Sequence, residues 1–177
     1  KYSEAHAIAL DKHAEPTVIG GLNNSLRYRW FDLSFLFSYQ FGGYSYDNWA
    51  QKTEHGGNDL KANIPTYYRD NWKQPGDVST YEVFMEKPSK AMSSCSTTRR
   101  LHSSDFVRLK TITFGFTLPK EWTSRAGISQ MRLYASANNL WTWAAYDYYD
   151  PESAINGVAS WGTPPLKSVT FGVNVNF

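Results

Sequence analysis

The residues that could do acid–base or metal chemistry are few and scattered in this sequence. No two of the four histidines have the short spacing of a zinc site; they are His6, His13, His55 and His102. Asp147, Asp150 and Glu152 lie close together and offer oxygens for Ca²⁺, although a solvated acidic turn is the simpler interpretation. No phosphate-binding glycine loop and no nucleophile motif occurs, and a glycosidase carboxylate pair has no reason to lie here. The sequence therefore predicts no catalytic residues, no cofactor and no metal.

Aromatic side chains are better candidates for binding than any titratable group. Aromatic residues make up 16% of the 177 residues and charged residues only 19%, with a net charge of +2 that gives no reason to expect nucleic acid. Several aromatic residues fall in two long polar stretches, where they could stack on sugar rings or hold peptide side chains. They could equally pack these stretches onto themselves or onto a protein partner. The candidates are Trp49, Tyr67, Tyr68, Trp72, Tyr146 and Tyr148.

Strict alternation of apolar and polar residues predicts the strands that must position these side chains. The clearest case is residues 167–177, in which Val169, Phe171, Val173, Val175 and Phe177 alternate with small or polar residues. Phe31 to Phe41 alternates in the same way, with large apolar groups at nearly every second position. Weaker alternation predicts three more strands, over Leu22–Arg29, Asp105–Leu118 and Met131–Asn138.

Two features refine this strand assignment. Arg29 and Trp30 fit the tip of a two-residue turn, although they are not the Asn-Gly or glycine-containing pair that such turns prefer. The apolar parity changes near Lys110, which predicts either a β-bulge or the boundary of a membrane. Short helices are expected over Tyr46–Glu54 and Ile64–Trp72, the second with Pro65 in its first turn.

The connections between the predicted strands alternate in length. Residues 29–30 and 120–130 are short, whereas 44–104 and 144–166 are long. Transmembrane β-barrels have this pattern, with short turns on the periplasmic side and long loops outside. Arg99, Arg100, Arg108 and Lys110 would then lie near the outer rim, where they could meet lipopolysaccharide phosphates, remain solvated or form pairs that face the lumen. The residues expected to face lipid are Phe35, Phe37, Phe114, Phe116, Phe171 and Val173.

Several segments resemble the C-terminal part of the SusC/RagA family of TonB-dependent outer-membrane transporters of Bacteroidetes. The longest runs from Arg100 to Pro119, RLHSSDFVRLKTITFGFTLP. Asn139-Leu140-Trp141-Thr142-Trp143 is similar to the Asn-Leu-aromatic-Thr segment of the family, and Tyr149-Asp150-Pro151-Glu152 and Trp72-Lys73-Gln74-Pro75-Gly76-Asp77 match further landmarks. The hairpin tip Arg29-Trp30 departs from the Lys-Gly that is frequent in the family.

The resemblance implies a 22-stranded barrel with an N-terminal plug, of which this chain, residues 1–177, supplies about five terminal antiparallel strands of an all-β fold. It implies extracellular loops at residues 43–104 and 142–166 and import of oligosaccharides or peptides across the cell outer membrane. The implied partners are the TonB complex, a SusD-like lipoprotein acting as a lid, and the barrel assembly machinery, which would read Phe177 as an assembly signal. The competing interpretation is a soluble extracellular β-sandwich that binds carbohydrate.

Overall fold

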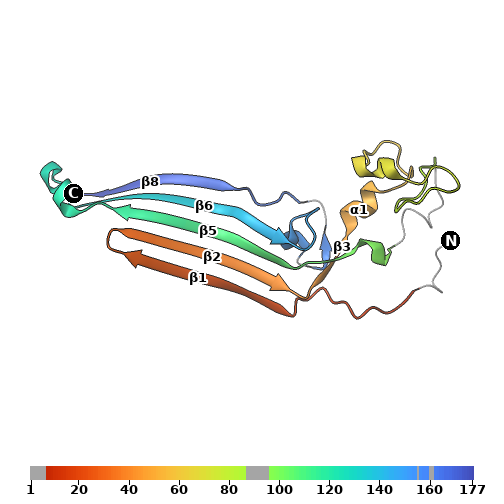
Figure 1. The fold of residues 1–177 in the computed structure, drawn as a ribbon, viewed down its shortest axis with the longest axis horizontal. Helices are drawn as coiled ribbons and strands as arrows, with labels where there is room; N and C mark the ends of the chain where they lie inside the picture. Colours follow the sequence, from red (N-terminus) through yellow and green to blue (C-terminus); the bar gives the residue numbers. More distant parts are fainter. Residues whose placement is uncertain (1–6, 87–95, 155, 160–161) are drawn as a thin grey trace.

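A long antiparallel sheet of five strands forms the body of the structure (Figure 1). The computed structural model describes residues 7–86, 96–154, 156–159 and 162–177. The strands lie in the order β1-β2-β5-β6-β8, so that each pairs with its nearest neighbour in sequence within this sheet. Their bounds are Val18–Tyr28 (β1), Phe31–Phe41 (β2), Phe106–Thr117 (β5), Gln130–Ala144 (β6) and Ser168–Asn176 (β8).

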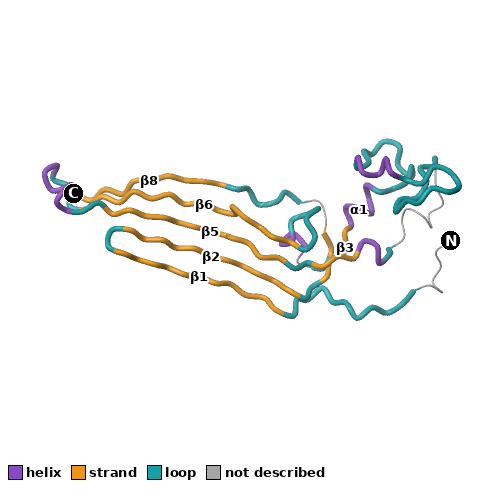
Figure 2. Tube along the Cα trace, in the orientation of Figure 1, coloured by secondary structure: helices purple, strands orange, loops and turns teal. Residues whose placement is uncertain are grey.

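The long connections gather at one end of this sheet and the short ones at the other (Figure 2). At the long-connection end, β3 (Tyr44–Asp47), β4 (Leu101–Ser103) and β7 (Val158–Ala159) form a second sheet in the order β4-β3-β7. This end also contains α1 (Asn48–Thr53), η2 (Thr66–Asp70), η3 (Thr98–Arg100) and η5 (Pro151–Ala154). The opposite end contains the β1–β2 turn and a connection with α3 (Lys120–Thr123) and η4 (Ser124–Ala126). The predicted alternation of connection lengths is therefore confirmed.

None of the helices in the described residues is long and apolar enough to cross a membrane.

The five predicted strands are confirmed as the strands of the large sheet, with differences at their ends, whereas β3, β4 and β7 were not predicted. β2 has the predicted bounds, and residues 29–30 form the predicted two-residue turn, with Arg29 at a φ of 52°. β1 begins at Val18 rather than Leu22, because Val18 pairs with Phe41 at the far end of β2. β6 continues to Ala144 rather than ending at Asn138, because its last residues pair with the first residues of β5.

The two predicted helices are shorter than expected. Residues 44–47 belong to β3, so the first helix is restricted to Asn48–Thr53, and the second is a 3-10 helix over Thr66–Asp70. Pairing with β4 and β7 outweighs the local helical preference of the residues before Asn48.

The change of parity near Lys110 is a β-bulge, as one of the two alternatives predicted. Lys110 has no partner in the register of β5 with either neighbouring strand. In β6 the register skips Asn139 and Leu140, and Asn139 has a φ of 53°. The extra residues keep Leu109 and Trp141 paired, so the apolar face continues past the irregularity.

The six residues expected to face lipid share one face of the sheet. Leu33, Phe114, Ala135 and Phe171 form one cross-strand row, and Phe31, Phe116, Leu133 and Val173 form the next. Phe35 and Phe37 continue this face along β2. Phe171 is 79% exposed and Val173 is 55% exposed, although both are large apolar groups. This sheet face is therefore an extensive apolar surface that the rest of the described chain leaves open.

The opposite face of the sheet is polar and internally bonded. Arg132 on β6 reaches Asp32 on β2, with Nε to Oδ1 at 3.1 Å and Nη2 to Oδ2 at 2.5 Å. The strand between them presents Gly115, where a Cβ would lie within 2.6 Å of these charged groups. Thr113 and Ser136 bond across β5 and β6 at 3.0 Å. The sheet therefore has one face suited to hydrocarbon and one suited to water or polar protein.

Candidate functional site at the junction of the long connections

The small sheet brings together segments that are far apart in the sequence. β3 and β4 belong to the first long connection and β7 to the second, and Tyr46 pairs with both Leu101 and Val158. The segment before β1 joins the same place, because the N–H of Tyr44 donates to the carbonyl of His13 at 2.9 Å. The outer connections are thus linked into one body at the end of the large sheet (Figure 1).

One buried carboxylate links the two long connections directly. Asp47 is 2% exposed and lies between β3 and α1. Its Oδ1 accepts the N–H of Ala50 at 2.8 Å and so caps α1, while its Oδ2 accepts the hydroxyl of Tyr146 at 2.8 Å. Ser45, also buried, bonds the hydroxyl of Tyr149. The carboxylate therefore fixes the start of α1 and the second connection at the same time.

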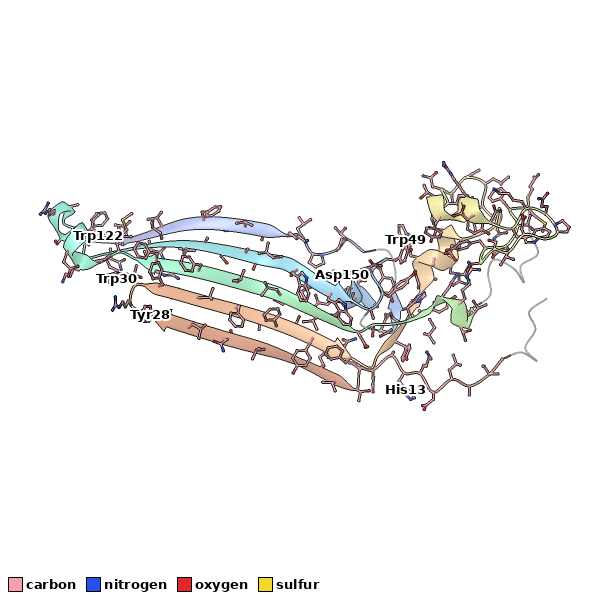
Figure 3. The ribbon with its side chains drawn as sticks, in the orientation of Figure 1. His13, Tyr28, Trp30, Trp49, Trp122 and Asp150 are labelled. Carbon is pink, nitrogen blue, oxygen red and sulfur yellow. The ribbon has the colours of Figure 1, made fainter. Side chains whose placement is uncertain are left out.

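The acidic residues of the second connection bind cations of the sheet. Arg108 on β5 is 2% exposed, and its guanidinium contacts Asp150 at 2.5 Å and also bonds Glu152. Lys110 contacts Glu152 at 2.6 Å. Arg108 also donates from Nε to Thr142 at 3.0 Å. These contacts draw the second connection back over the polar face of the sheet (Figure 3).

These ion pairs bear on the two interpretations of the acidic segment, a Ca²⁺ site and a solvated turn. Asp150 and Glu152 are neutralised by Arg108 and Lys110, and Asp147 does not take part in these ion pairs. In the part of the chain that the structure describes, no group of three His, Cys, Asp or Glu residues could hold a metal ion. The acidic segment is an internal ion-pair partner rather than a solvated turn or a chelating loop.

The cations of η3 are paired in a similar way. Arg99 contacts Glu54 at 3.6 Å and Glu82 at 3.2 Å, and Arg100 contacts Glu54 at 3.8 Å. Glu54 also accepts the hydroxyl of Tyr67 at 3.0 Å. Of the three roles considered for the four cations near this end, internal pairing is therefore the one that the structure contains.

Three of the six aromatic binding candidates come together in one cluster. The ring of Tyr148 lies 6.0 Å from Tyr67 and 5.1 Å from Tyr146, between centroids. Tyr81 adds a ring 5.4 Å from Tyr67. Because Tyr148 is 68% exposed, the cluster presents an open aromatic surface to the outside.

The other three candidates differ in their exposure. Tyr68 is 1% exposed, and its ring centroid lies 5.3 Å from that of Tyr81, so it packs against the buried side of the cluster. Trp49 lies on α1 with 41% of its surface exposed (Figure 3). Trp72 is half-buried, and its backbone N–H donates to the carbonyl of Tyr81 at 2.9 Å.

Sequence reasoning did not identify four residues of this junction. Tyr81 and Tyr149 complete the cluster, and His102 stacks on Tyr146 with centroids 3.7 Å apart and planes within 5°. Asp47 had one usable signal, since an aspartate directly before a short helix is a favoured N-cap. The partners of Tyr81 and His102 are far away in sequence, so no local pattern could have indicated them.

Burial keeps the tyrosines of the cluster neutral. It raises the pKa of Tyr68 to about 12, with the negative charge of Glu82 acting in the same direction. Burial first, and then the hydrogen bond to Asp47, raises the pKa of Tyr146, and burial followed by the charge of Glu54 raises that of Tyr67. Their hydroxyls donate to internal acceptors. The tyrosines of the cluster can therefore offer ring surfaces to a ligand, while their hydroxyls stay protonated at neutral pH.

The hydrogen bond between Tyr146 and Asp47 should hold the two connections together. Tyr146→Phe would leave one oxygen of a buried carboxylate without its donor, which costs about 1–3 kcal/mol. We expect faster hydrogen exchange in residues 44–54 and 145–154 of the full-length protein. Tyr148→Phe is the matched control, because the exposed ring of Tyr148 makes no hydrogen bond through its hydroxyl in the described structure. Equal exchange in the two variants would contradict this role of Asp47.

Acidification should loosen the same junction through His102. Burial lowers the pKa of His102 in the folded state, so the unfolded segment takes up the proton first. The stability is complete above about pH 6.5 and is lost as the pH falls through the folded pKa. Protease cleavage within the connections should accelerate between neutral pH and pH 5.5, roughly one unit below that value. His102→Phe keeps the stacked ring and should remove the pH dependence; a persistent dependence would assign it to another group.

Several known proteins are similar to this chain in sequence and in fold. No family model matches the chain. It is similar to two TonB-dependent receptors of Formosa agariphila: P39, with 29% identity over 165 residues, and P3, with 29% identity over 174 residues. These matches cover 89% and 92% of this chain but only 16% of each receptor, so the chain spans about a sixth of the length of these relatives.

Solved structures show the same fold. The structure of the RagAB peptide importer in the closed-closed state matches with a TM-score of 0.85 and 25% identity, and the open-open state with 0.84 and 24%. Both matches cover all of this chain and 19% of the matched chain. These findings confirm the resemblance seen in the sequence. The chain is similar in sequence to TonB-dependent receptors, and its antiparallel sheet has the same fold as a segment of the RagAB peptide importer structure.

Proposed function

We propose that this chain is part of an outer-membrane TonB-dependent importer, to which it contributes terminal strands of the barrel wall and two outer loops. The observation that carries this proposal is the extensive apolar face of the five-stranded sheet, together with the family likeness. β2 has 11 residues, which at about 3.3 Å per residue and a tilt of about 45° span about 25 Å. That height matches the apolar band of outer-membrane barrels.

The same face argues against a soluble sandwich. A sandwich needs a second sheet about 10 Å away to cover its apolar side. The described chain instead leaves Leu22, Phe114 and Phe171 exposed on this face. Its edge strands β1 and β8 each need a further strand, because open edges are not tolerated in hydrocarbon. In a large barrel, which has about 22 strands in the SusC/RagA family and a plug inside, neighbouring strands would pair with both edges.

The aromatic cluster is a proposed contact for the transported solute. It lies at the end of the sheet that would face outward. The ion pairs of Arg108 with Asp150 and Glu152 hold the second connection, which carries Tyr148, against the polar face. Exposed rings can stack on sugars or pack against peptide side chains, so oligosaccharides and peptides both fit. The likeness to a protein named as a peptide importer favours peptides. Tyr67, Tyr81 and Tyr148 are the rings proposed to make contact.

The first long connection is the proposed contact for a SusD-like lipoprotein lid. It exposes apolar side chains where an isolated polar loop would have none, among them Leu60 at 62%, Val78 at 102% and Phe84 at 43%. Trp49 and Trp72 lie in the same connection and belong to the residue types that anchor interfaces. The TonB complex would act through a part of the protein that this chain does not contain.

An allelic complementation tests the barrel and the import together. A strain without the gene is complemented with wild type, Phe171→Arg or Thr170→Arg, in the full-length receptor. Phe171→Arg would bury a charge near the midplane and should cost about 2–4 kcal/mol, whereas Thr170→Arg lies on the polar face and should cost little. Heat-resistant receptor in the outer membrane and uptake of labelled oligopeptides and oligosaccharides are measured.

We expect Phe171→Arg alone to lower both readouts, and uptake to require an intact TonB system. Equal effects of the two arginines would contradict a lipid-facing role for this face. Uptake of neither solute by the wild type would contradict the import proposal.

Phe177 is 90% exposed at the short-connection end. In the same assay, deletion of Phe177 should lower the amount of receptor in the outer membrane, because the strand that it ends must pair to close the sheet edge. The receptor that does reach the membrane should keep its heat resistance.

The lid proposal is tested by charges on the exposed apolar side chains. Leu60→Glu and Val78→Glu should reduce co-purification of the lipoprotein, because a charge would be desolvated in the interface. Asn63→Glu, at an exposed polar position of the same connection, is the control and should keep the partner. Full co-purification with the double variant would remove this connection from the interface.

A further inference from the structure

The short-connection end of the sheet has an unusual combination of exposed aromatic rings and cations. Tyr28 is 69% exposed, Trp30 46% and Trp122 67%, and Figure 3 shows all three at this end. Tyr28 and Trp30 border the β1–β2 turn, while Trp122 lies on α3 between β5 and β6. They are thus supplied by two separate connections that meet at one edge of the molecule.

The same two connections are strongly basic. Residues 27–32 and 118–132 contain five cations and two carboxylates, Asp32 and Glu121. Asp32 is bonded to Arg132. Arg29, Lys120 and Arg125 are exposed, and none of them forms an ion pair within the described residues. Arg29 instead lies over the ring of Tyr28, with its guanidinium carbon 5.5 Å from the ring centroid.

The opposite end of the sheet also carries cations, but part of them are paired. Arg99, Arg100, Arg108 and Lys110 have carboxylate partners there, while Lys61, Arg69 and Lys73 are exposed on the first long connection. What distinguishes the short-connection end is that its unpaired cations lie beside the exposed rings of Tyr28, Trp30 and Trp122 at the end of the apolar face. An open cluster of cations at a fixed place provides attraction for an anionic partner.

The aromatic rings indicate what kind of anionic partner fits. Tryptophan and tyrosine prefer the level of the lipid headgroups, where one part of the ring is apolar and another can hydrogen-bond. Tyr28 pairs with Phe31 at the edge of the apolar face, so the basic end borders directly on the surface proposed to contact hydrocarbon. An acidic protein partner would explain the cations but would not explain this continuity with the apolar face.

We propose that Arg29, Lys120 and Arg125, with Tyr28, Trp30 and Trp122, form a basic rim that binds the phosphate groups of anionic phospholipids in the leaflet nearest the short connections. Arginine and lysine bind phosphate through charge-assisted hydrogen bonds. The rim rests on the proposed function, because it requires the sheet to be embedded in a membrane. It adds a preference for one class of lipid headgroup, which a barrel wall by itself does not require.

The test is folding of the full-length receptor into vesicles of two compositions at low salt: phosphatidylcholine alone, and phosphatidylcholine with phosphatidylglycerol. Urea titration gives the folding equilibrium constant in each. Since a cation near an anionic leaflet contributes about fivefold, the wild type should favour the anionic vesicles by about tenfold or more. High salt should reduce this preference, because it screens the charges.

Two triple variants assign the preference to its residues. Arg29→Gln with Lys120→Gln and Arg125→Gln should lose most of the difference between the vesicles while folding normally in phosphatidylcholine. Lys61→Gln with Arg69→Gln and Lys73→Gln removes the same charge from exposed positions of the first long connection and should keep the difference. The proposal is overturned if the wild type folds equally in both vesicles, as it would with an acidic protein as partner, or if both triple variants lose the same amount. A receptor that folds into neither vesicle would overturn the membrane proposal and the rim with it.

Discussion

The structure depends on a sheet whose two faces cannot share one environment. Backbone pairing fixes the register of five strands, and this register gathers large apolar groups on one side and polar or charged groups on the other. Exposing the apolar side to water would be unfavourable at about 25 cal/mol per Å². Nothing in the described chain covers it. A membrane and further strands therefore explain this sheet better than an isolated soluble domain does.

The polar side has its own requirements, which govern the loops. Arg108 is almost fully buried, and a buried cation without a partner is strongly unfavourable. Asp150 and Glu152 supply the partners, and in doing so they bring the second connection back over the sheet. Asp47 then fastens this connection to the first through Tyr146. The position of the exposed tyrosine surface is thus a consequence of satisfying two buried charges.

The two ends differ in how cations and aromatic rings are combined. At the end with the long connections, Arg99, Arg100, Arg108 and Lys110 form internal ion pairs. Arg29, Lys120 and Arg125 at the other end remain open beside exposed rings. A protein that crosses a membrane meets a different polar layer on each side, and the two ends of this sheet differ in the corresponding way.

The sequence by itself determined the five strands of the large sheet and their apolar and polar faces, because alternation with period two is a local property that backbone pairing preserves. It indicated β2 at its observed bounds, the turn at Arg29-Trp30 and a change of parity near Lys110, for which a bulge was one of two explanations. Only the tertiary structure decided that Asp150 and Glu152 bind Arg108 and Lys110 instead of calcium. It also decided that Tyr67 meets Tyr148, and that β6 continues to Ala144 beside Phe106. The partners in these contacts are tens of residues apart, so their pairing depends on how the connections fold over the sheet, and no local pattern in the sequence records that geometry.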